Sequence, residues 1–135
     1  MSDLPAVVAP VAPLLGAPAA EQAALDEDHR RLVAQLRESW SLVASVTTTD
    51  ADCLHSVMDV ADDALHQILH ALSAALLTGD HRTVEETAAW VADVLRTRGA
   101  DEMMLHELVA VLTVAMRDYP LAGGLVESHF VVPAG

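Results

Sequence analysis

Proline is absent from Glu21 to Tyr119, and glycine occurs in that stretch only at Gly79 and Gly99. Because proline breaks helices and glycine commonly ends them, this placement favours a series of helices separated at the two glycines. Apolar residues recur there at helical spacing, and no alternating run of strand length occurs. The sequence therefore predicts an all-α fold, either globin-like or a four-helix bundle, with four main helices plus a short C-terminal segment.

The first two helices are separated by a Thr/Asp cluster at residues 47–50. We expect the first helix over about residues 21–46 and the second over about residues 51–77. Thr49 or Asp50 is the predicted N-cap of the second helix, since a short polar side chain can accept a hydrogen bond from the first turn. Gly79 is the natural stop at its C-terminal end.

The third helix is expected to open with a capping box. Thr83 and Glu86 have the T-x-x-E spacing in which each side chain bonds to the backbone of the other residue. Gly99 ends this helix, and Arg96 and Arg98 in its last turn complement the helix dipole.

The fourth helix is apolar on nearly every side. Asp101 is its predicted N-cap and Pro120 its stop, and an apolar tail follows over residues 121–132. Since a helix of this kind must be covered, it is central in the fold or lies in an oligomer interface. We expect a homodimer through this surface, which Glu at Val111 and Met116 would disrupt.

The apolar stripes of the four helices predict a shared core. Trp90 lies beside such a stripe, and packing accounts for it as it does for Trp40. The residues expected to pack together are Leu36, Trp40, Leu65, Leu69, Leu72, Val91, Leu95, Leu108 and Leu112.

The first twenty residues are interrupted by Pro5, Pro10, Pro13 and Pro18. This predicts a mobile Pro/Ala-rich tail over residues 1–20, followed by a single helical domain over residues 21–135. The stretch has no basic n-region, and the chain has no apolar run of membrane-spanning length. We therefore expect no membrane association and a cytoplasmic location.

Charge and composition exclude several functions. The formal net charge is −13, and all seven basic residues are arginine. A surface this negative disfavours nucleic acid and anionic lipid as partners. The absence of lysine removes Schiff-base chemistry and the P-loop. Ser41 and the single Cys53 have no triad-like partners at a recognisable spacing, so we do not expect an enzyme.

The second helix concentrates His and Asp side chains on one face. His55, Asp59, Asp62, His66 and His70 fall within a sector of about 80° beside the apolar stripe. His66 and His70 are one turn apart and could ligate a metal, with oxygen from Asp59 or Asp62, and His55 with Asp59 offers another pair. The alternative is a solvent-exposed helix face on which Asp and His side chains one turn apart pair with each other.

Two stretches resemble bacterial globins. Residues 36–44, LRESWSLVA, resemble the first globin helix with its packing tryptophan, and residues 95–103, LRTRGADEM, resemble the corner before the penultimate helix. The resemblance extends to the shortened, often haem-free sensor domains of stress-response regulators of the RsbR type. It implies a non-catalytic sensor or regulatory domain that dimerises and acts on a protein partner through helix contacts.

The same resemblance bears on haem. The position of the globin proximal histidine is occupied by Leu95, which cannot ligate iron. His66 lies near the expected place of a distal histidine. We therefore expect no cofactor, and the alternative is a haem- or metal-binding protein that uses His66 with His106 or His70. Otherwise His106 is a hydrogen-bonded core or interface residue.

Overall fold

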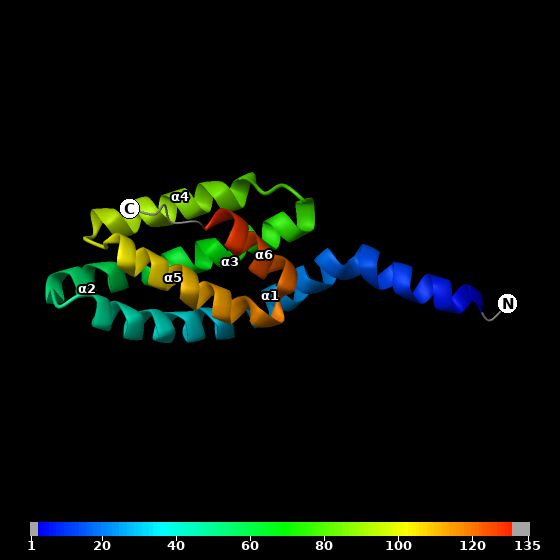
Figure 1. The fold of residues 1–135 in the computed structure, drawn as a ribbon, viewed down its shortest axis with the longest axis horizontal. Helices are drawn as coiled ribbons and strands as arrows, with labels where there is room; N and C mark the ends of the chain where they lie inside the picture. The colour runs from blue at the N-terminus through cyan, green and yellow to red at the C-terminus, as the bar shows by residue number, and fades with distance from the viewer. Residues whose placement is uncertain (1–2, 131–135) are drawn as a thin grey trace.

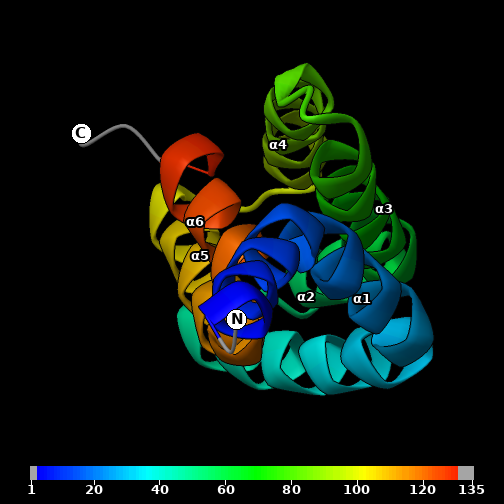
Figure 2. The same ribbon diagram turned by 90° about the vertical axis from the view of Figure 1, so that its right-hand side faces the viewer.

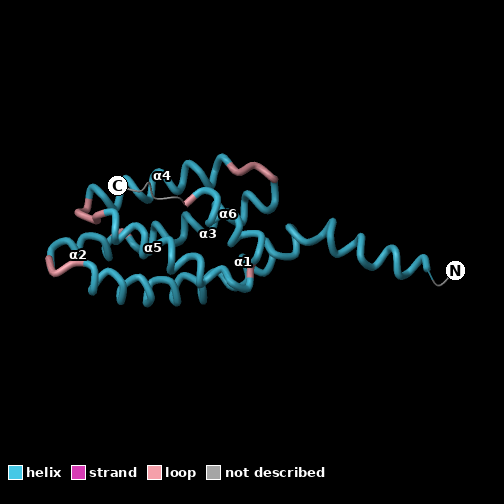
Figure 3. Tube along the Cα trace, in the orientation of Figure 1, coloured by secondary structure: helices cyan, strands magenta, loops and turns pink. Residues whose placement is uncertain are grey.

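The computed structural model describes the backbone of residues 3–130 and the side chains of residues 17–130. Every regular element in this part of the chain is helical, which confirms the all-α class, and short loops join the helices (Figure 3). The elements are α1 (Asp3–Thr47), α2 (Ala51–Asp59), α3 (Ala61–Thr78), α4 (Arg82–Thr97), α5 (Glu102–Ala115), the 3-10 turn η1 (Met116–Asp118) and α6 (Pro120–His129).

The helices pack around α1 and α3. Helix α3 packs against α1 and α4, and α5 packs against α1 as well (Figure 1). Helix α6 contacts α5, α3 and α4 (Figure 2). Helices α4 and α5 are not among the closely packed pairs, and this leaves space between them. No described helix combines the length and the apolar character that crossing a bilayer requires.

Three predicted helix ends are confirmed. Asp50 caps α2 by accepting hydrogen bonds from the backbone N–H groups of Asp52 and Cys53. Asp101 caps α5 by accepting from the N–H of Met104. Gly79 ends α3 in the left-handed region at φ 76°, a conformation that costs glycine little because it has no Cβ.

The predicted capping box at the start of α4 is wrong. Thr83 already lies inside α4, which begins at Arg82, and no side chain caps the helix from the adjoining position. Asp80 takes this role instead, since its Oδ1 accepts from the Arg82 N–H at 3.0 Å and from the Arg82 side chain at 3.1 Å. The hydrogen bonds from the Arg82 side chain and backbone lower the pKa of Asp80 to about 2.

The helix predicted over residues 51–77 is two helices that meet at Val60. Its N–H bonds to the Met58 carbonyl, and α3 starts at the next residue. Val57 and Ala61 on either side of the bend are both fully buried. The bend therefore lets both segments turn apolar side chains to the core.

Helix α1 begins at Asp3, whereas the sequence predicts a start at residue 21. The helix continues through Pro10, Pro13 and Pro18, although each proline removes a backbone hydrogen bond and costs about 3 kcal/mol relative to Ala. Figure 1 shows this end of α1 extending beyond the other helices. Mobility of residues 1–20 stays a prediction.

Residues 121–129 of the apolar C-terminal segment are helical and belong to α6. Pro120 occupies the first turn of α6, where its missing N–H costs nothing. The Glu21 carboxylate accepts from the N–H groups of Leu121 and Ala122 at 3.1 and 2.6 Å, which joins α1 to the positive end of the α6 dipole. Val131 and Val132 lie outside the described residues.

All nine predicted core residues are buried. The prediction that Trp90 packs in the core is wrong, because 43% of its surface is exposed. Its ring lies beside Gln67, Glu86 and Thr87. Helix α5 is not covered on all sides within the chain itself, since Met103 and Val114 are 63% and 58% exposed, and its burial in an oligomer stays a prediction.

Candidate functional site

A groove of about 310 Å³ lies between α4 and α5 and is closed at one end by the C-terminus of α6. It exists because α4 packs on α3 and α6 rather than along α5. Twelve residues line it: Glu85, Ala88, Ala89, Val91, Ala92, Asp93, Arg96, Leu105, Leu108, Val109, His129 and Phe130.

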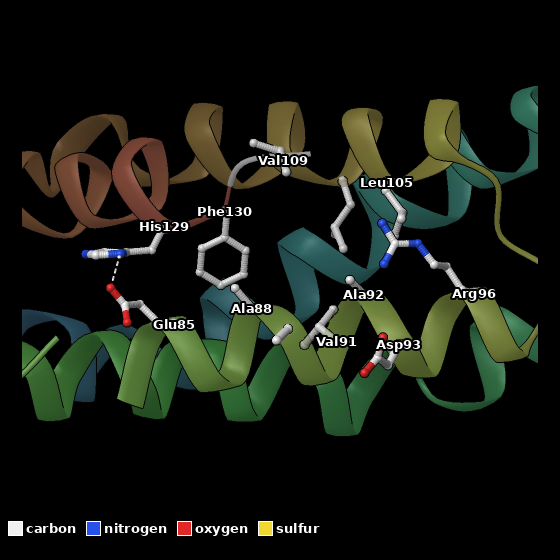
Figure 4. A pocket seen from close by; sticks show the side chains of 12 residues that line it. Glu85, Ala88, Val91, Ala92, Asp93, Arg96, Leu105, Val109, His129 and Phe130 are labelled. Carbon is white, nitrogen blue, oxygen red and sulfur yellow. Dashed lines mark ion pairs between the residues drawn. The ribbon is translucent and has the colours of Figure 1, made fainter. Parts of the chain in front are cut away.

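The middle of the groove is apolar. Ala88 and Ala92, one turn apart on α4, face Leu105 and Val109 of α5 across it (Figure 4). The alanine methyl groups are too short to fill the space between the two helices. Phe130 projects toward Ala88 and is itself buried, so an aromatic ring forms the wall at the α6 end.

At the end near α6, a histidine of α6 lies against a carboxylate of α4. His129 Nδ1 lies 3.3 Å from a carboxylate oxygen of Glu85, and the two side chains join α6 to α4 (Figure 4). The ring of His81 lies edge-on to that of His129, with centroids 5.4 Å apart. Opening this end of the groove requires the α6 C-terminus to move away from α4.

The opposite end is held by Arg96. Its Nε and a terminal nitrogen donate to the two carboxylate oxygens of Glu102 at 3.1 and 3.4 Å. This hydrogen bond raises the pKa of Arg96, so the guanidinium stays charged. Since Glu102 is in the first turn of α5, the pair connects α4 to α5 beyond the apolar section.

Three histidines meet on a different side of the molecule, between α1 and α3. His29 Nε2 lies 2.6 Å from His66 Nδ1, with the rings stacked at 4.8 Å, and the His70 ring lies 5.0 Å from that of His29. Burial lowers the pKa of His29, and the neighbouring imidazoles lower it further. Asp26 acts in the opposite direction and accepts from the Ser73 hydroxyl at 2.7 Å.

The predicted metal set is divided by the fold. His66 and His70 lie on α3 beside His29, whereas His55 and Asp59 are exposed on α2. Asp59 pairs with Arg98 at 3.5 Å. Within the described part of the chain, no three His, Cys, Asp or Glu side chains are arranged to hold a metal ion.

Of the histidines considered for haem, His66 and His70 lie on α3 and His106 lies on α5. His106 is exposed on α5 and makes no hydrogen bond among the described residues, so it is not a hydrogen-bonded core residue, and the interface role stays a prediction. Leu95 is buried in the core. The groove contains one histidine, His129, which is engaged with Glu85.

A polar cluster that sequence spacing does not reveal joins α1 to the end of η1. The buried Tyr119 hydroxyl donates to Asp28, and Arg31 donates to the same hydroxyl at 3.2 Å. Arg31 also pairs with Asp28 at 3.3 Å. Burial, and then the bond to Asp28, raises the pKa of Tyr119 to about 12. The cluster fixes the direction in which the chain leaves η1 for α6.

Comparison with known proteins gives no relative. No protein-family model matches the chain, and no curated protein or solved structure is significantly similar to it. The groove and its surroundings are therefore interpreted from their own chemistry.

Proposed function

We propose that this chain is a non-catalytic sensor or regulatory domain that binds a small, largely apolar molecule between α4 and α5. It then acts on a protein partner through helix contacts. The groove carries the proposal, because its volume of about 310 Å³ reaches the size of small-molecule sites and its middle is apolar with charged groups at both ends.

A molecule bound in the groove would change how α4 and α5 are held relative to each other. Helices α4 and α5 are joined at the Arg96–Glu102 pair and, through α6, at the Glu85–His129 pair, with little packing between. A molecule between Ala92 and Leu105 supplies the missing contact. It therefore favours the arrangement in which the helices are held together, and shifts the population toward that state.

The groove lining favours binding over reaction. It contains no Ser, Thr, Cys or Lys that could serve as a nucleophile, and its one histidine faces Glu85. The two globin-like stretches support the same class, since the domains they resemble act as sensors. Ser41 and Cys53 lie outside the groove lining.

Binding can be tested with the neutral fluorescent dye N-phenyl-1-naphthylamine, which brightens in apolar sites. Ala92→Leu should fill the space opposite Leu105 and weaken dye binding at least about tenfold. The matched control is Ala34→Leu at an exposed position of α1 outside the groove, which should leave the affinity unchanged. Equal affinity in both variants and the parent chain would place the dye elsewhere and refute the site.

Haem or metal binding is the second candidate, and the meeting of His29, His66 and His70 is the observation that favours it. Haemin titration followed by absorption distinguishes the two candidates. A stoichiometric Soret band lost in His66→Ala would favour the second. A featureless spectrum, together with dye binding, would favour the first.

A further inference from the structure

Trp90 lies in a hollow on the surface of α3 and α4, two helices that pack side by side (Figure 2). The hollow has a volume of about 290 Å³, and four residues line it: Gln67 of α3, and Glu86, Thr87 and Trp90 of α4. Because residues three and four apart lie on the same face of a helix, Glu86 and Thr87 are both neighbours of the Trp90 ring. We call this hollow the Trp90 site.

The Trp90 site is separate from the groove between α4 and α5. No residue lines both, and the groove residues Ala88 and Ala92 lie on another side of α4. The volume of the Trp90 site is close to the lower limit of roughly 300 Å³ for small-molecule sites, so it suits a small chemical group. Its ligand therefore goes beyond the proposed function and follows from its own lining.

The lining combines an aromatic face with one carboxylate. Trp90 is 43% exposed, and the face of an indole attracts cations more strongly than that of Tyr or Phe. Glu86 is exposed and has no ion pair among the described residues. Arg82, one turn earlier on α4, directs its Nε and a terminal nitrogen to Asp80 at 3.1 and 2.9 Å. The Glu86 carboxylate is thus open to a positively charged ligand beside the ring.

The surroundings of the site have the same sign. Within one turn of the lining residues on α3 and α4, the net charge is −3 with neutral histidines, from one guanidinium and four carboxylates: Arg82, Asp63, Glu85, Glu86 and Asp93. This negative potential raises the local concentration of cations and lowers that of anions. Gln67 and Thr87 add an amide and a hydroxyl that can bond to a polar end of the ligand.

We propose that the Trp90 site binds a small alkylated ammonium ion, such as the trimethylammonium group of choline. Its methyl groups lie against the indole face, and its charge lies next to Glu86. A primary ammonium is a compact, strongly hydrated charge, whereas a quaternary ammonium holds water weakly and gains more from an aromatic face. The hydroxyl of choline can bond to Gln67 or Thr87.

Heteronuclear NMR of the full chain tests the proposal, because Trp40 and Trp90 are its two tryptophans and each gives one indole N–H signal. Choline is the probe, and 3,3-dimethyl-1-butanol is the neutral control of the same shape, with carbon in place of the charged nitrogen. Choline should shift the Trp90 signal, which Trp90→Phe identifies, and should bind at least about fivefold more tightly than the butanol. Equal affinity for the two compounds, or an unmoved Trp90 signal, would overturn the proposal.

The role of Glu86 is tested by removing its charge. Glu86→Gln should weaken choline binding about threefold and leave the butanol unaffected, since an exposed charge contributes modestly. The matched control is Glu38→Gln, which removes the same charge from an exposed position of α1 and should leave both affinities unchanged. An equal loss in both variants would show that the overall charge attracts the cation, and would refute the site.

The trimethylammonium group can belong to a soluble molecule or to a lipid headgroup. Co-sedimentation with phosphatidylcholine vesicles distinguishes these sources. A headgroup ligand would carry the parent chain into the pellet but not Trp90→Leu, whereas a soluble ligand would leave both chains in the supernatant.

Discussion

Leu108 separates the groove from the interior, so its truncation links stability to ligand binding. Its side chain lines the groove on one side and a small inner cavity of about 10 Å³ on the other. Leu112, one turn further along α5, is fully buried and lines neither space. Replacing each by Ala removes the same atoms from two different surroundings.

The magnitudes follow from those surroundings. Each Leu→Ala change removes three carbon groups from a buried position, which costs about 2.5 kcal/mol in transfer free energy. A void of roughly 60 Å³ at residue 112 would stay closed and add about 1.5 kcal/mol. At residue 108 the space opens into the groove and water can enter. We therefore expect about 2.5 kcal/mol for Leu108→Ala and about 4 kcal/mol for Leu112→Ala.

Urea unfolding followed by circular dichroism measures the two costs, and dye titration measures the groove. Leu108→Ala deepens the groove toward Trp40 and should bind N-phenyl-1-naphthylamine about fivefold more tightly, or roughly 1 kcal/mol. Leu112→Ala should leave dye affinity unchanged. Equal costs for the two variants, with no gain in dye affinity at residue 108, would refute the placement of Leu108 between the two spaces.

Two further predictions concern titratable groups. The pKa of His29 is lowered in the folded chain, so as the pH falls the unfolded chain binds the proton before the folded chain does. The contribution of neutral His29 to the free energy of unfolding is therefore complete above pH 6.5 and decreases below it. Urea unfolding at about pH 7.5 and about pH 5.5 measures this loss of stability, and the loss should be smaller in His29→Gln, which keeps His66, His70 and Asp26. An equal loss in the variant and the parent chain would contradict the prediction. Tyr119 is the single tyrosine, so its absorbance should titrate near 12 rather than 10. Asp28→Asn should lower that midpoint, and a midpoint of 10 in the parent chain would show the cluster absent.

The helix boundaries that could be predicted are those set by local chemistry. Asp50 and Asp101 cap helices through hydrogen bonds within three residues, and Gly79 ends α3 through its own backbone freedom. The bend at Val60 has no such signal in the sequence, and Val57 and Ala61 on either side of it are buried in the core. Thr83 shows the opposite error, since a capping motif was present and Asp80 replaced it.

The candidate site could not be predicted from spacing, because it depends on which helices do not pack together. Ala88 and Ala92 look like ordinary core positions of an amphipathic helix until α5 is known to stand away from them. The same holds for His29, whose neighbours His66 and His70 are on another helix. Periodicity along one helix orders its faces but does not identify what covers each.

The exposed residues show how this limit bears on function. Periodicity placed Trp90 against the core and the apolar side chains of α5 in the core or an oligomer interface, and Trp90, Met103 and Val114 are all exposed in the chain itself. Met116, proposed as a dimer contact, is buried inside the chain instead. The helices therefore carry more apolar surface than their own packing covers. Most of this excess lies on α1 and α5, where Leu42, Val46, Met103 and Val114 are exposed. An exposed apolar surface of this kind is typical of sites that contact another molecule, so what covers it has to come from outside the periodicity of either helix.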